Sequence, residues 1–182
     1  MKQANMVTLS GESILLHVCC APCAAGCMER LLAAYKQVAL YYSNSNIATD
    51  GEFERRLACV EDLACRFSVP LYVDPYDHGA WLARAGQLAD APEGGERCRL
   101  CFEWSLGRAA EKSAREGFGA FATTLTVSPR KRSGLLLQTG ADFPAFAPWD
   151  FKKRDGYRRG VELAREWGYY RQDFCGCEFS LR

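Results

Sequence analysis

Seven cysteines of this 182-residue chain gather in three short clusters. The first cluster holds three thiols within five residues, in the segment HVCCAPC, and the other two are pairs far downstream. The clustered cysteines are Cys19, Cys20, Cys23, Cys98, Cys101, Cys175 and Cys177. In a reducing compartment such groups are more typical of metal ligands or redox centres than of structural disulfides. We therefore predict that the three clusters meet at one metal-containing redox site.

Two of these clusters contain cysteines spaced C-x2-C, at positions 20–23 and 98–101. Two such pairs supply four thiolates, the usual number for a structural zinc ion or for an iron–sulfur cluster. Cys19 is a further thiol beyond these four, although a turn could direct Cys19 and Cys20 to different irons of one cluster. The spacing therefore predicts a metal and leaves the choice between zinc and iron open.

The pair nearest the end of the chain, Cys175 and Cys177, is separated by one glycine. A disulfide between them would close a very small ring, which should be strained and therefore easily reduced. Gly176 supplies the backbone freedom that such a ring demands. The pair is thus a candidate redox couple, and it is equally a candidate pair of metal ligands.

Other cysteines and the two histidines have simpler interpretations. Cys59 and Cys65 stand singly in a helical pattern, where a buried free cysteine packs as a small hydrophobe. His17 lies within an apolar run and is predicted to be a buried histidine with hydrogen-bond partners rather than a metal ligand. His78 is expected at the surface or as a capping residue near the start of a helix.

The elements that position these side chains alternate between short apolar strands and longer helices. The predicted strands are 13–18, 37–42, 70–74 and 118–127, with 146–151 as a short strand or a loop. The predicted helices are 23–35, 50–67, 78–88, 96–116, 133–139 and 157–167, the second of them capped by Asp50. Such alternation predicts an α/β fold, a Rossmann-like parallel sheet flanked by helices, with an irregular tail over 169–182 that packs on the body.

In an open parallel sheet, functional sites form beyond the carboxyl ends of the strands. The first cysteine cluster follows the first strand, and polar side chains follow the others. These are Asn44 and Asn46 after the second strand, Asp74 after the third and Ser128 after the fourth. We expect all of them at one edge of the sheet, in a single domain that covers residues 1–182.

Basic residues are unevenly distributed along the chain. The formal net charge is only +1, but residues 130–160 carry eight Lys or Arg against three Asp. This stretch suits an anionic partner such as RNA, and a solvated basic face is the simpler alternative. The candidate RNA-binding residues are Arg130, Lys131, Arg132, Lys152 and Lys153. The aromatic residues that could stack a base or belong to the core are Phe146, Trp149, Phe151 and Tyr157.

The composition, 48% hydrophobic and 25% charged, is typical of a soluble globular protein. No apolar run approaches the roughly 20 residues that span a bilayer. The first six residues are too short and polar for a signal peptide, so a cytoplasmic location is expected and a membrane partner is not.

Several motifs that occur in a fixed order resemble one family, the cobalamin-independent epoxyqueuosine reductases (QueH). The motifs are HVCCAPC, YSNSNI, RCRLCFEW, TTLTVSPRK, DFKKRDGY and YRQDFCGCEFS, and the resemblance covers roughly residues 13–181. It implies a fold related to the nucleotide α-hydrolase group, and reduction of epoxyqueuosine to queuosine at the wobble position of tRNA, in the anticodon loop. It also implies a [4Fe-4S] cluster, an additional mononuclear iron, and an electron donor that the sequence does not identify.

The resemblance also implies roles for individual residues. The implied cluster ligands are Cys19, Cys20, Cys98 and Cys101. Cys23 would lie beside the additional iron, and Cys175 and Cys177 would form a reducible pair near it or help to bind it. Removal of an epoxide oxygen also takes two protons, and the candidate proton donors are Tyr157, Arg158 or Asp173.

Two other classes of function compete with the reductase. One is a non-catalytic RNA-binding module whose two C-x2-C pairs hold zinc, and the other is an electron-transfer protein with no substrate of its own. Zinc predicts a colourless protein that stays folded in air, whereas a cluster predicts a brown protein that bleaches on oxidation. An electron carrier would need neither the basic stretch 130–160 nor a pocket.

Overall fold

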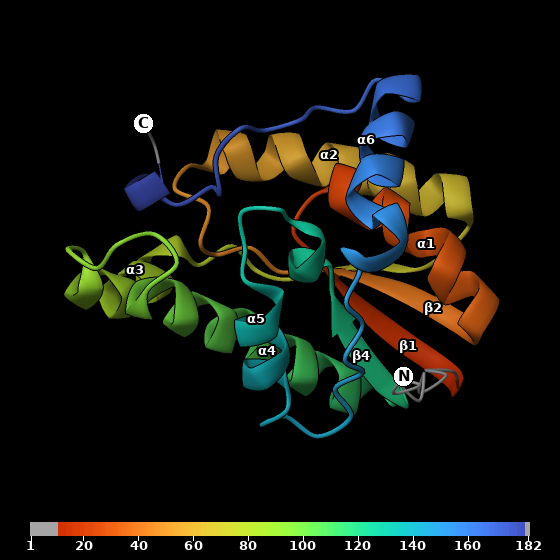
Figure 1. Cartoon of the computed structure of the whole chain (residues 1–182), viewed down its shortest axis with the longest axis horizontal. Helices are drawn as coiled ribbons and strands as arrows, with labels where there is room; N and C mark the ends of the chain where they lie inside the picture. Colours follow the sequence, from red (N-terminus) through yellow and green to blue (C-terminus); the bar gives the residue numbers. More distant parts are fainter. Residues whose placement is uncertain (1–10, 181–182) are drawn as a thin grey trace, which may run out of the picture.

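The computed structural model describes residues 11–180, and its centre is a four-stranded parallel sheet (Figure 1). The strands, in the spatial order β3-β2-β1-β4, are β1 (Gly11–Val18), β2 (Tyr35–Tyr42), β3 (Leu71–Val73) and β4 (Ala120–Thr123). β1 is central, and its Leu16 aligns with Leu40 of β2 and Ala122 of β4. Residues 14–18 are buried, which agrees with the absence of polar alternation in this run. The predicted parallel α/β sheet is confirmed.

Helices cover both faces of the sheet (Figure 1). They are α1 (Ala21–Ala34), α2 (Asp50–Phe67), α3 (His78–Ala85), α4 (Glu96–Glu116), α5 (Ser133–Gly140) and α6 (Gly156–Glu166). On one face, Leu16 packs with Met28 of α1 and Leu163 of α6 in the largest hydrophobic cluster. On the other face, Leu15 packs with Leu106 of α4. Successive residues of β1 therefore bury their side chains in two separate cores.

The fourth strand is shorter than the sequence predicts. β4 ends at Thr123, and the next four residues form the 3₁₀ helix η2 (Thr124–Val127). The Thr123 hydroxyl accepts a hydrogen bond from the Leu125 amide at 3.1 Å and so caps this turn. The β-branched run is typical of a strand, but local side-chain hydrogen bonding competes with the sheet and ends it.

The cap of α2 also differs from the prediction. Thr49, not Asp50, is the N-cap, and its hydroxyl accepts a hydrogen bond from the Glu52 amide at 3.3 Å. Asp50 is the first helical residue, where a negative charge is favourable beside the helix N-terminus.

The remaining connections are short. Residues 146–151 form a loop that meets β4 through a single bridge between Phe121 and Phe146. The tail after α6 is irregular apart from the 3₁₀ helix η4 (Glu178–Ser180), and it packs on the body as predicted. Within residues 11–180, no helix is both long and apolar enough to cross a membrane.

α1 and α6 approach each other at glycines. A Cβ atom on Gly160 would collide with the carbonyl oxygen of Pro22, and one on Gly26 would collide with the carbonyl oxygen of Gly156. The two helices are therefore in backbone contact, and α6 packs against the first turn of α1. That turn directly follows Cys19 and Cys20 and contains Cys23.

Candidate metal and redox site

The first cysteine cluster lies where β1 turns into α1. Cys20 is the N-cap of α1, and Pro22 occupies the first turn, where its missing N–H costs nothing. The sulfur atoms of Cys19, Cys20 and Cys23 lie within 4.8 Å of one another. The Cys19 amide donates to the Thr124 hydroxyl at 3.0 Å, which holds this residue against η2. Three sulfur atoms at this spacing are able to bind a metal ion.

The three thiols of this cluster differ in acidity. Hydrogen bonds with Cys20 and Cys23 hold the pKa of Cys19 well below its ordinary value, and the nearby Lys131 ammonium acts in the same direction. The hydrogen bond with Cys19 raises the pKa of Cys20 to about 12. Hydrogen bonds with Cys19 and Cys20, together with burial, raise the pKa of Cys23. Cys19 is therefore the most acidic thiol of the group, and the thiolate is the form that binds metals.

The second cluster lies on one face of α4. Cys98, Cys101 and Ser105 follow one another at spacings of three and four residues, so their side chains share that face. The Gly94 amide donates to the Cys98 sulfur at 3.2 Å. Burial raises the pKa of the Cys101 thiol, and the nearby Cys175 adds to this effect. Such a thiol stays protonated until a metal ion replaces its proton.

The third cluster is held by residues from distant parts of the chain. Arg56 donates to the Cys175 carbonyl oxygen at 3.1 Å, and the Ala48 amide donates to the Gly176 carbonyl oxygen at 2.9 Å. Gly176 has a φ of +126°, and a Cβ atom there would lie 3.3 Å from the Arg56 guanidinium, so this position requires glycine. Cys175 and Cys177 are free thiols in this structure, and a disulfide between them remains a prediction.

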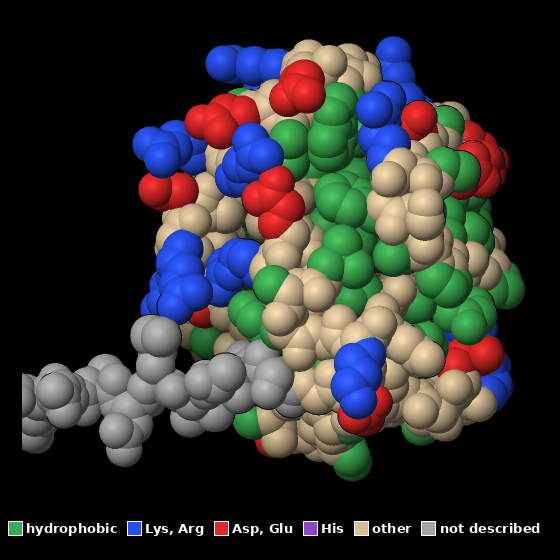
Figure 2. Space-filling model, turned by 90° about the vertical axis from the view of Figure 1, so that its right-hand side faces the viewer, with side chains coloured by type: hydrophobic (Ala, Val, Ile, Leu, Met, Phe, Trp, Pro, Cys, Tyr) green, Lys and Arg blue, Asp and Glu red, His purple; other side chains and the backbone are tan. Residues whose placement is uncertain are grey.

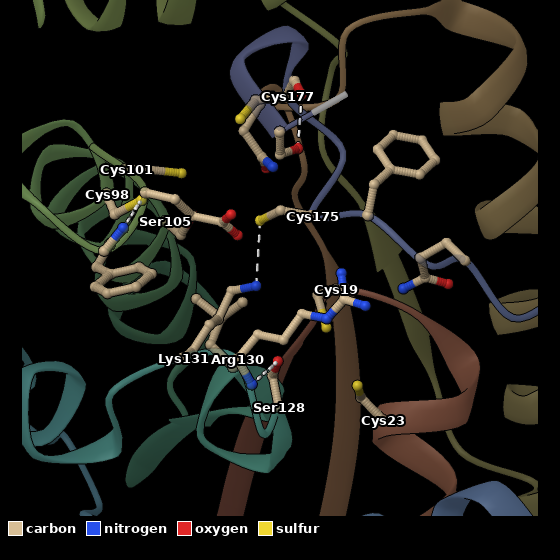
Figure 3. A pocket seen from close by; sticks show the side chains of 18 of the residues that line it. Cys19, Cys23, Cys98, Cys101, Ser105, Ser128, Arg130, Lys131, Cys175 and Cys177 are labelled. Carbon is tan, nitrogen blue, oxygen red and sulfur yellow. Dashed lines mark hydrogen bonds between the residues drawn. The ribbon is translucent and has the colours of Figure 1, made fainter. Parts of the chain in front are cut away.

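One cavity of about 400 Å³ joins the three clusters (Figure 3). Its lining includes six cysteines, namely Cys19, Cys23, Cys98, Cys101, Cys175 and Cys177. Cys20, 1% exposed, is buried beside the first two. In Figure 3, Cys98 and Cys101 lie across the hollow from Cys19 and Cys23, with Cys175 between them. The structure thus brings all three predicted clusters to one place.

An ammonium group projects among these thiols. Lys131 donates to the Cys175 sulfur at 3.2 Å (Figure 3). Burial opposes the positive charge, but negative charge on Cys175 and Cys19 outweighs it and raises the pKa of Lys131. Lys152 donates to the Lys131 carbonyl oxygen and holds the backbone at this residue. Lys131 is therefore a fixed cation that faces the thiols rather than solvent.

The mouth of the cavity is basic. Arg130, Arg132 and Arg171 are exposed and line it. Asp173 lines it as well, and its carbonyl oxygen accepts a hydrogen bond from Arg130. Arg171 is absent from the predicted RNA-binding set because it lies in the irregular tail, outside the basic stretch 130–160.

Three other predicted residues lie at the mouth of the cavity or beyond it. Lys153 is exposed, and its carbonyl oxygen accepts a hydrogen bond from Arg30 at 3.1 Å. Arg158 pairs with Asp155 at 3.1 Å on the exposed side of α6 and is not among the residues that line the cavity. Tyr157 does line it, and this side chain is 44% exposed at the mouth. Of the candidate proton donors Tyr157 and Arg158, Tyr157 is therefore the one placed to reach a substrate.

The polar residues predicted at the strand ends behave in two ways. Those that line the cavity are Asn44, Asn46 and Ser128. Asp74 instead accepts hydrogen bonds from Ser43, at 2.8 Å, and from Arg108. Burial would raise the pKa of Asp74, but hydrogen bonds from Arg108, Ser43 and Tyr41 outweigh it and hold the pKa below its ordinary value. Asp74 therefore stabilises the fold next to the site without facing into it.

The prediction for His17 is confirmed. Its ring is 1% exposed, with Nδ1 at 2.9 Å from the Thr123 hydroxyl and Nε2 at 3.0 Å from the Ser43 carbonyl oxygen. The isolated cysteines differ. Cys59 packs partly buried against the core, but Cys65 is exposed, so the prediction of a buried thiol is wrong for Cys65. A helical pattern places a residue on a helix more reliably than it selects the covered face.

The expectation for His78 is wrong. The cap of α3 is Asp77, whose carboxylate accepts a hydrogen bond from the third residue beyond it. The His78 ring is half-buried and lies 2.9 Å from the Ser45 carbonyl oxygen and 3.1 Å from the Glu178 carboxylate. It therefore ties the start of α3 to the tail, a contact across 100 residues of sequence.

Two buried arginines of the cavity wall are absent from the predicted site. Arg56 is 3% exposed and pairs with Glu52 at 2.6 Å. Arg97 donates to the carbonyl oxygens of Leu88, at 3.2 Å, and Ala89, at 2.7 Å. The spacing of Glu52 and Arg56 indicates an ion pair on a helix, but a single sequence gives no sign that the tail covers it.

A family model described as Epoxyqueuosine reductase QueH matches residues 14–182. Relatives that bear this same name extend over most of the chain. The protein of Streptococcus pyogenes serotype M1 is 36% identical over 181 residues, which cover 93% of this chain and 71% of the relative. That of Staphylococcus aureus strain Mu50 is 35% identical over 180 residues, 92% of this chain and 75% of the relative. That of Thermotoga maritima is 32% identical over 179 residues, 93% of this chain and 90% of the relative.

Proposed function

This chain belongs to the epoxyqueuosine reductase QueH family and is an oxidoreductase of queuosine biosynthesis, and we propose that its reaction takes place in the cysteine-lined cavity. The proposed substrate is tRNA with epoxyqueuosine at the wobble position of the anticodon loop, and the product is queuosine. The observation that carries this proposal is the convergence of six cysteines and Lys131 on one cavity of about 400 Å³. Pockets that enclose small organic ligands typically measure about 300–1,000 Å³.

The donor set fits a cluster of iron and sulfide. Three thiols lie within 4.8 Å of one another, two more lie across the cavity, and soft thiolate ligands favour iron–sulfur clusters or zinc. When bound, a [4Fe-4S] cluster with a neighbouring mononuclear iron supplies single electrons and a Lewis acid for the epoxide oxygen. Cys23 is the proposed residue beside the mononuclear iron. The proposed cluster ligands are Cys19, Cys20, Cys98 and Cys101.

The chain's own residues account for the other requirements of the reaction. Removal of the epoxide oxygen as water takes two electrons and two protons. Oxidation of Cys175 and Cys177 to a disulfide releases two electrons and two protons, so this pair matches the demand of one turnover. The Lys131 ammonium donates a hydrogen bond to the Cys175 sulfur at 3.2 Å, at the proposed redox pair. Asp173 and Tyr157 line the cavity near solvent and are the proposed proton donors.

The mouth of the cavity suits an anticodon loop. Arg130, Arg132 and Arg171 are exposed there, and guanidinium groups neutralise backbone phosphates. The wobble base must leave the loop to reach the thiols, which is easier from a single strand than from a duplex. The face in Figure 2 carries a band of hydrophobic side chains with positive and negative side chains intermixed around it, so no wholly basic surface competes there with the mouth as the RNA contact. The electron donor is not identified, and a cytoplasmic location remains a prediction.

Anaerobic purification with iron and acid-labile sulfide analysis tests the proposal. We expect roughly five irons and four sulfides per chain, and broad visible absorbance that bleaches in air. The protein should then reduce epoxyqueuosine in tRNA when a chemical reductant supplies electrons. Zinc in place of iron, no sulfide, and no reductase activity after reconstitution with iron and sulfide would contradict the proposal. That result would favour a zinc-stabilised RNA-binding module instead.

A further inference from the structure

The aromatic side chains that line the cavity differ in what covers their rings. They are Trp81, Phe102, Tyr157 and Phe174. Trp81 is 1% exposed and stacks on His78, with ring centroids 5.6 Å apart. Phe102 is 5% exposed and packs in a hydrophobic cluster with Leu125 and Leu136. Neither of these two rings has a face available to a ligand.

Phe174 is held in another way. In the described part of the chain its ring pairs with no other aromatic ring, and it belongs to none of the three hydrophobic clusters. The Arg56 guanidinium lies 5.2 Å from its ring centroid. Arg56 is itself buried and fixed by Glu52, so it stays on that side of the ring. Phe174 lines the cavity, and a ring with a buried cation over one face is suited to stack a second planar group on the other.

The backbone on both sides of Phe174 is also fixed. Arg130 donates to the carbonyl oxygen of the preceding residue. Arg56 donates to the Cys175 carbonyl oxygen at 3.1 Å, and Lys131 donates to the Cys175 sulfur at 3.2 Å. With the backbone held at these points, Phe174 already lies at the cavity before a ligand binds, which favours its use as a preformed contact.

We propose that Phe174 is the stacking surface for the purine-like base of the extruded wobble nucleotide. This inference rests on the proposed function and adds a positioning residue to it. Because Phe174 directly precedes Cys175, a base stacked on its ring lies next to the thiol pair and to Lys131. Tyr157, 44% exposed at the mouth, remains available to a base that stays outside the cavity.

Phe174→Leu and Phe179→Leu form a matched pair of variants. Phe179 also lies in the tail, with the Arg97 guanidinium 4.5 Å from its ring centroid, but it does not line the cavity. Binding is measured with an anticodon stem-loop RNA that has guanine at the wobble position, and with the same RNA carrying an abasic wobble nucleotide. Phe174→Leu should weaken binding of the guanine RNA about tenfold and of the abasic RNA less than about twofold. Phe179→Leu should leave the ratio of the two affinities unchanged.

A second variant at Phe174 keeps the test independent of a folding defect. Phe174→Trp retains a planar ring and should bind both RNAs within about twofold of the unsubstituted protein. The added indole fluorescence should be quenched by the guanine RNA and not by the abasic RNA. Thermal unfolding midpoints of all three variants show whether each is folded under the binding conditions.

Two results overturn the stacking role alone, and a third contradicts the proposed function on which it rests. Equal weakening of the two RNAs by Phe174→Leu, or no difference in quenching of Phe174→Trp, would show that the ring only holds the tail. Failure of the unsubstituted, iron-loaded protein both to bind the guanine RNA and to reduce epoxyqueuosine in tRNA would contradict the proposed function itself, and the stacking role with it.

Discussion

The β1–α1 turn and the C-terminal tail bring cysteines to the same cavity by different means. In the turn, Cys19 follows a buried strand and Cys20 caps a helix, so regular backbone hydrogen bonds fix the sulfur atoms. In the tail, Cys175 lies in irregular backbone, and its place depends on Arg56 and Lys131. One wall of the site is built from local structure, and the other is held by cations that come from distant elements.

This difference predicts different dynamics for the two walls. A segment without regular structure opens by breaking a few side-chain contacts, whereas a strand–helix junction opens only with the surrounding core. The turn therefore suits thiols that hold a metal permanently. The tail suits a pair of thiols that changes its redox state, as proposed for Cys175 and Cys177.

The largest expected effect on stability tests whether the contact with α6 supports the β1–α1 turn. A Cβ atom on Gly160 would collide with the Pro22 carbonyl oxygen in the first turn of α1. Both partners are backbone, so the clash is relieved only by moving α1, and Gly160→Ala should lower the free energy of unfolding by about 3 kcal/mol. Urea-induced unfolding followed by circular dichroism measures this change.

The control for this variant is Gly134→Ala in α5. A Cβ atom at Gly134 would meet nothing within 4 Å. The substitution should therefore leave stability unchanged or raise it by up to about 1 kcal/mol. If Gly160→Ala were as harmless as Gly134→Ala, the backbone contact between α1 and α6 would not support the turn.

Arg56→Met should loosen the tail without disturbing the turn. It removes the hydrogen bond to the Cys175 carbonyl oxygen and the ion pair with Glu52, and it should lower the free energy of unfolding by about 2 kcal/mol. Amide hydrogen exchange, measured by mass spectrometry, should accelerate in residues 173–178 and stay the same in residues 19–27.

The same helix offers a matched control for Arg56→Met. Arg66 pairs with Asp62 at the same spacing, but both side chains are more than 40% exposed. Arg66→Met should therefore change stability by less than about 0.5 kcal/mol. Faster exchange in both cysteine segments after Arg56→Met would mean that the two walls open together, against the difference inferred here.

The turn could be predicted from the sequence, because its signals are local. An apolar run without alternation, then Pro22 and clustered thiols, indicates a buried strand that leads into a helix. Parallel-strand geometry then places Cys19, Asn44 and Ser128 at one edge. The error at η2 has a local cause too, since the Thr123 hydroxyl ends a strand that the residue types favour.

For the tail, the sequence predicts a cysteine pair but does not indicate which residues contact it. Arg56 is 119 residues away from the carbonyl oxygen that it binds, and Lys131 is 44 residues from the Cys175 sulfur. No periodicity links such residues. The basic stretch correctly indicates arginines near the site, but it cannot separate Lys131, which faces the thiols, from Arg132, which faces solvent.

Asp74 provides a comparison at the same edge of the sheet. It follows β3 as Cys19 follows β1, but Arg108 and Ser43 already satisfy its carboxylate. Its pKa in the fold lies below the ordinary value of 3.8, so the ionised carboxylate stabilises the fold above that pH. This stabilisation is lost as the pH falls through the lower pKa of the folded state. Asp74→Asn should therefore destabilise by about 1 kcal/mol at neutral pH and by less below about pH 4.

Urea unfolding of both proteins at several pH values measures this dependence. The difference in unfolding free energy should be constant at neutral pH and shrink on acidification. A difference that stays the same in acid would mean that Asp74 acts through hydrogen bonding alone, without a contribution from its charge.

The smallest expected change in stability is at the mouth of the cavity, and it tests which basic residues contact the RNA. Arg132 is exposed at the mouth, and the Lys152 ammonium donates to the Lys131 carbonyl oxygen. Arg132→Gln should change the free energy of unfolding by less than about 0.5 kcal/mol, yet weaken binding of the anticodon stem-loop RNA and lower the salt dependence by about one counterion. Lys152→Met should change the salt dependence less, because the Lys152 ammonium is held at the Lys131 carbonyl oxygen and does not line the cavity. An equal loss of salt dependence in both variants would show that Lys152 also contacts the RNA. The proposed phosphate-binding surface would then extend beyond the mouth of the cavity, toward the thiols.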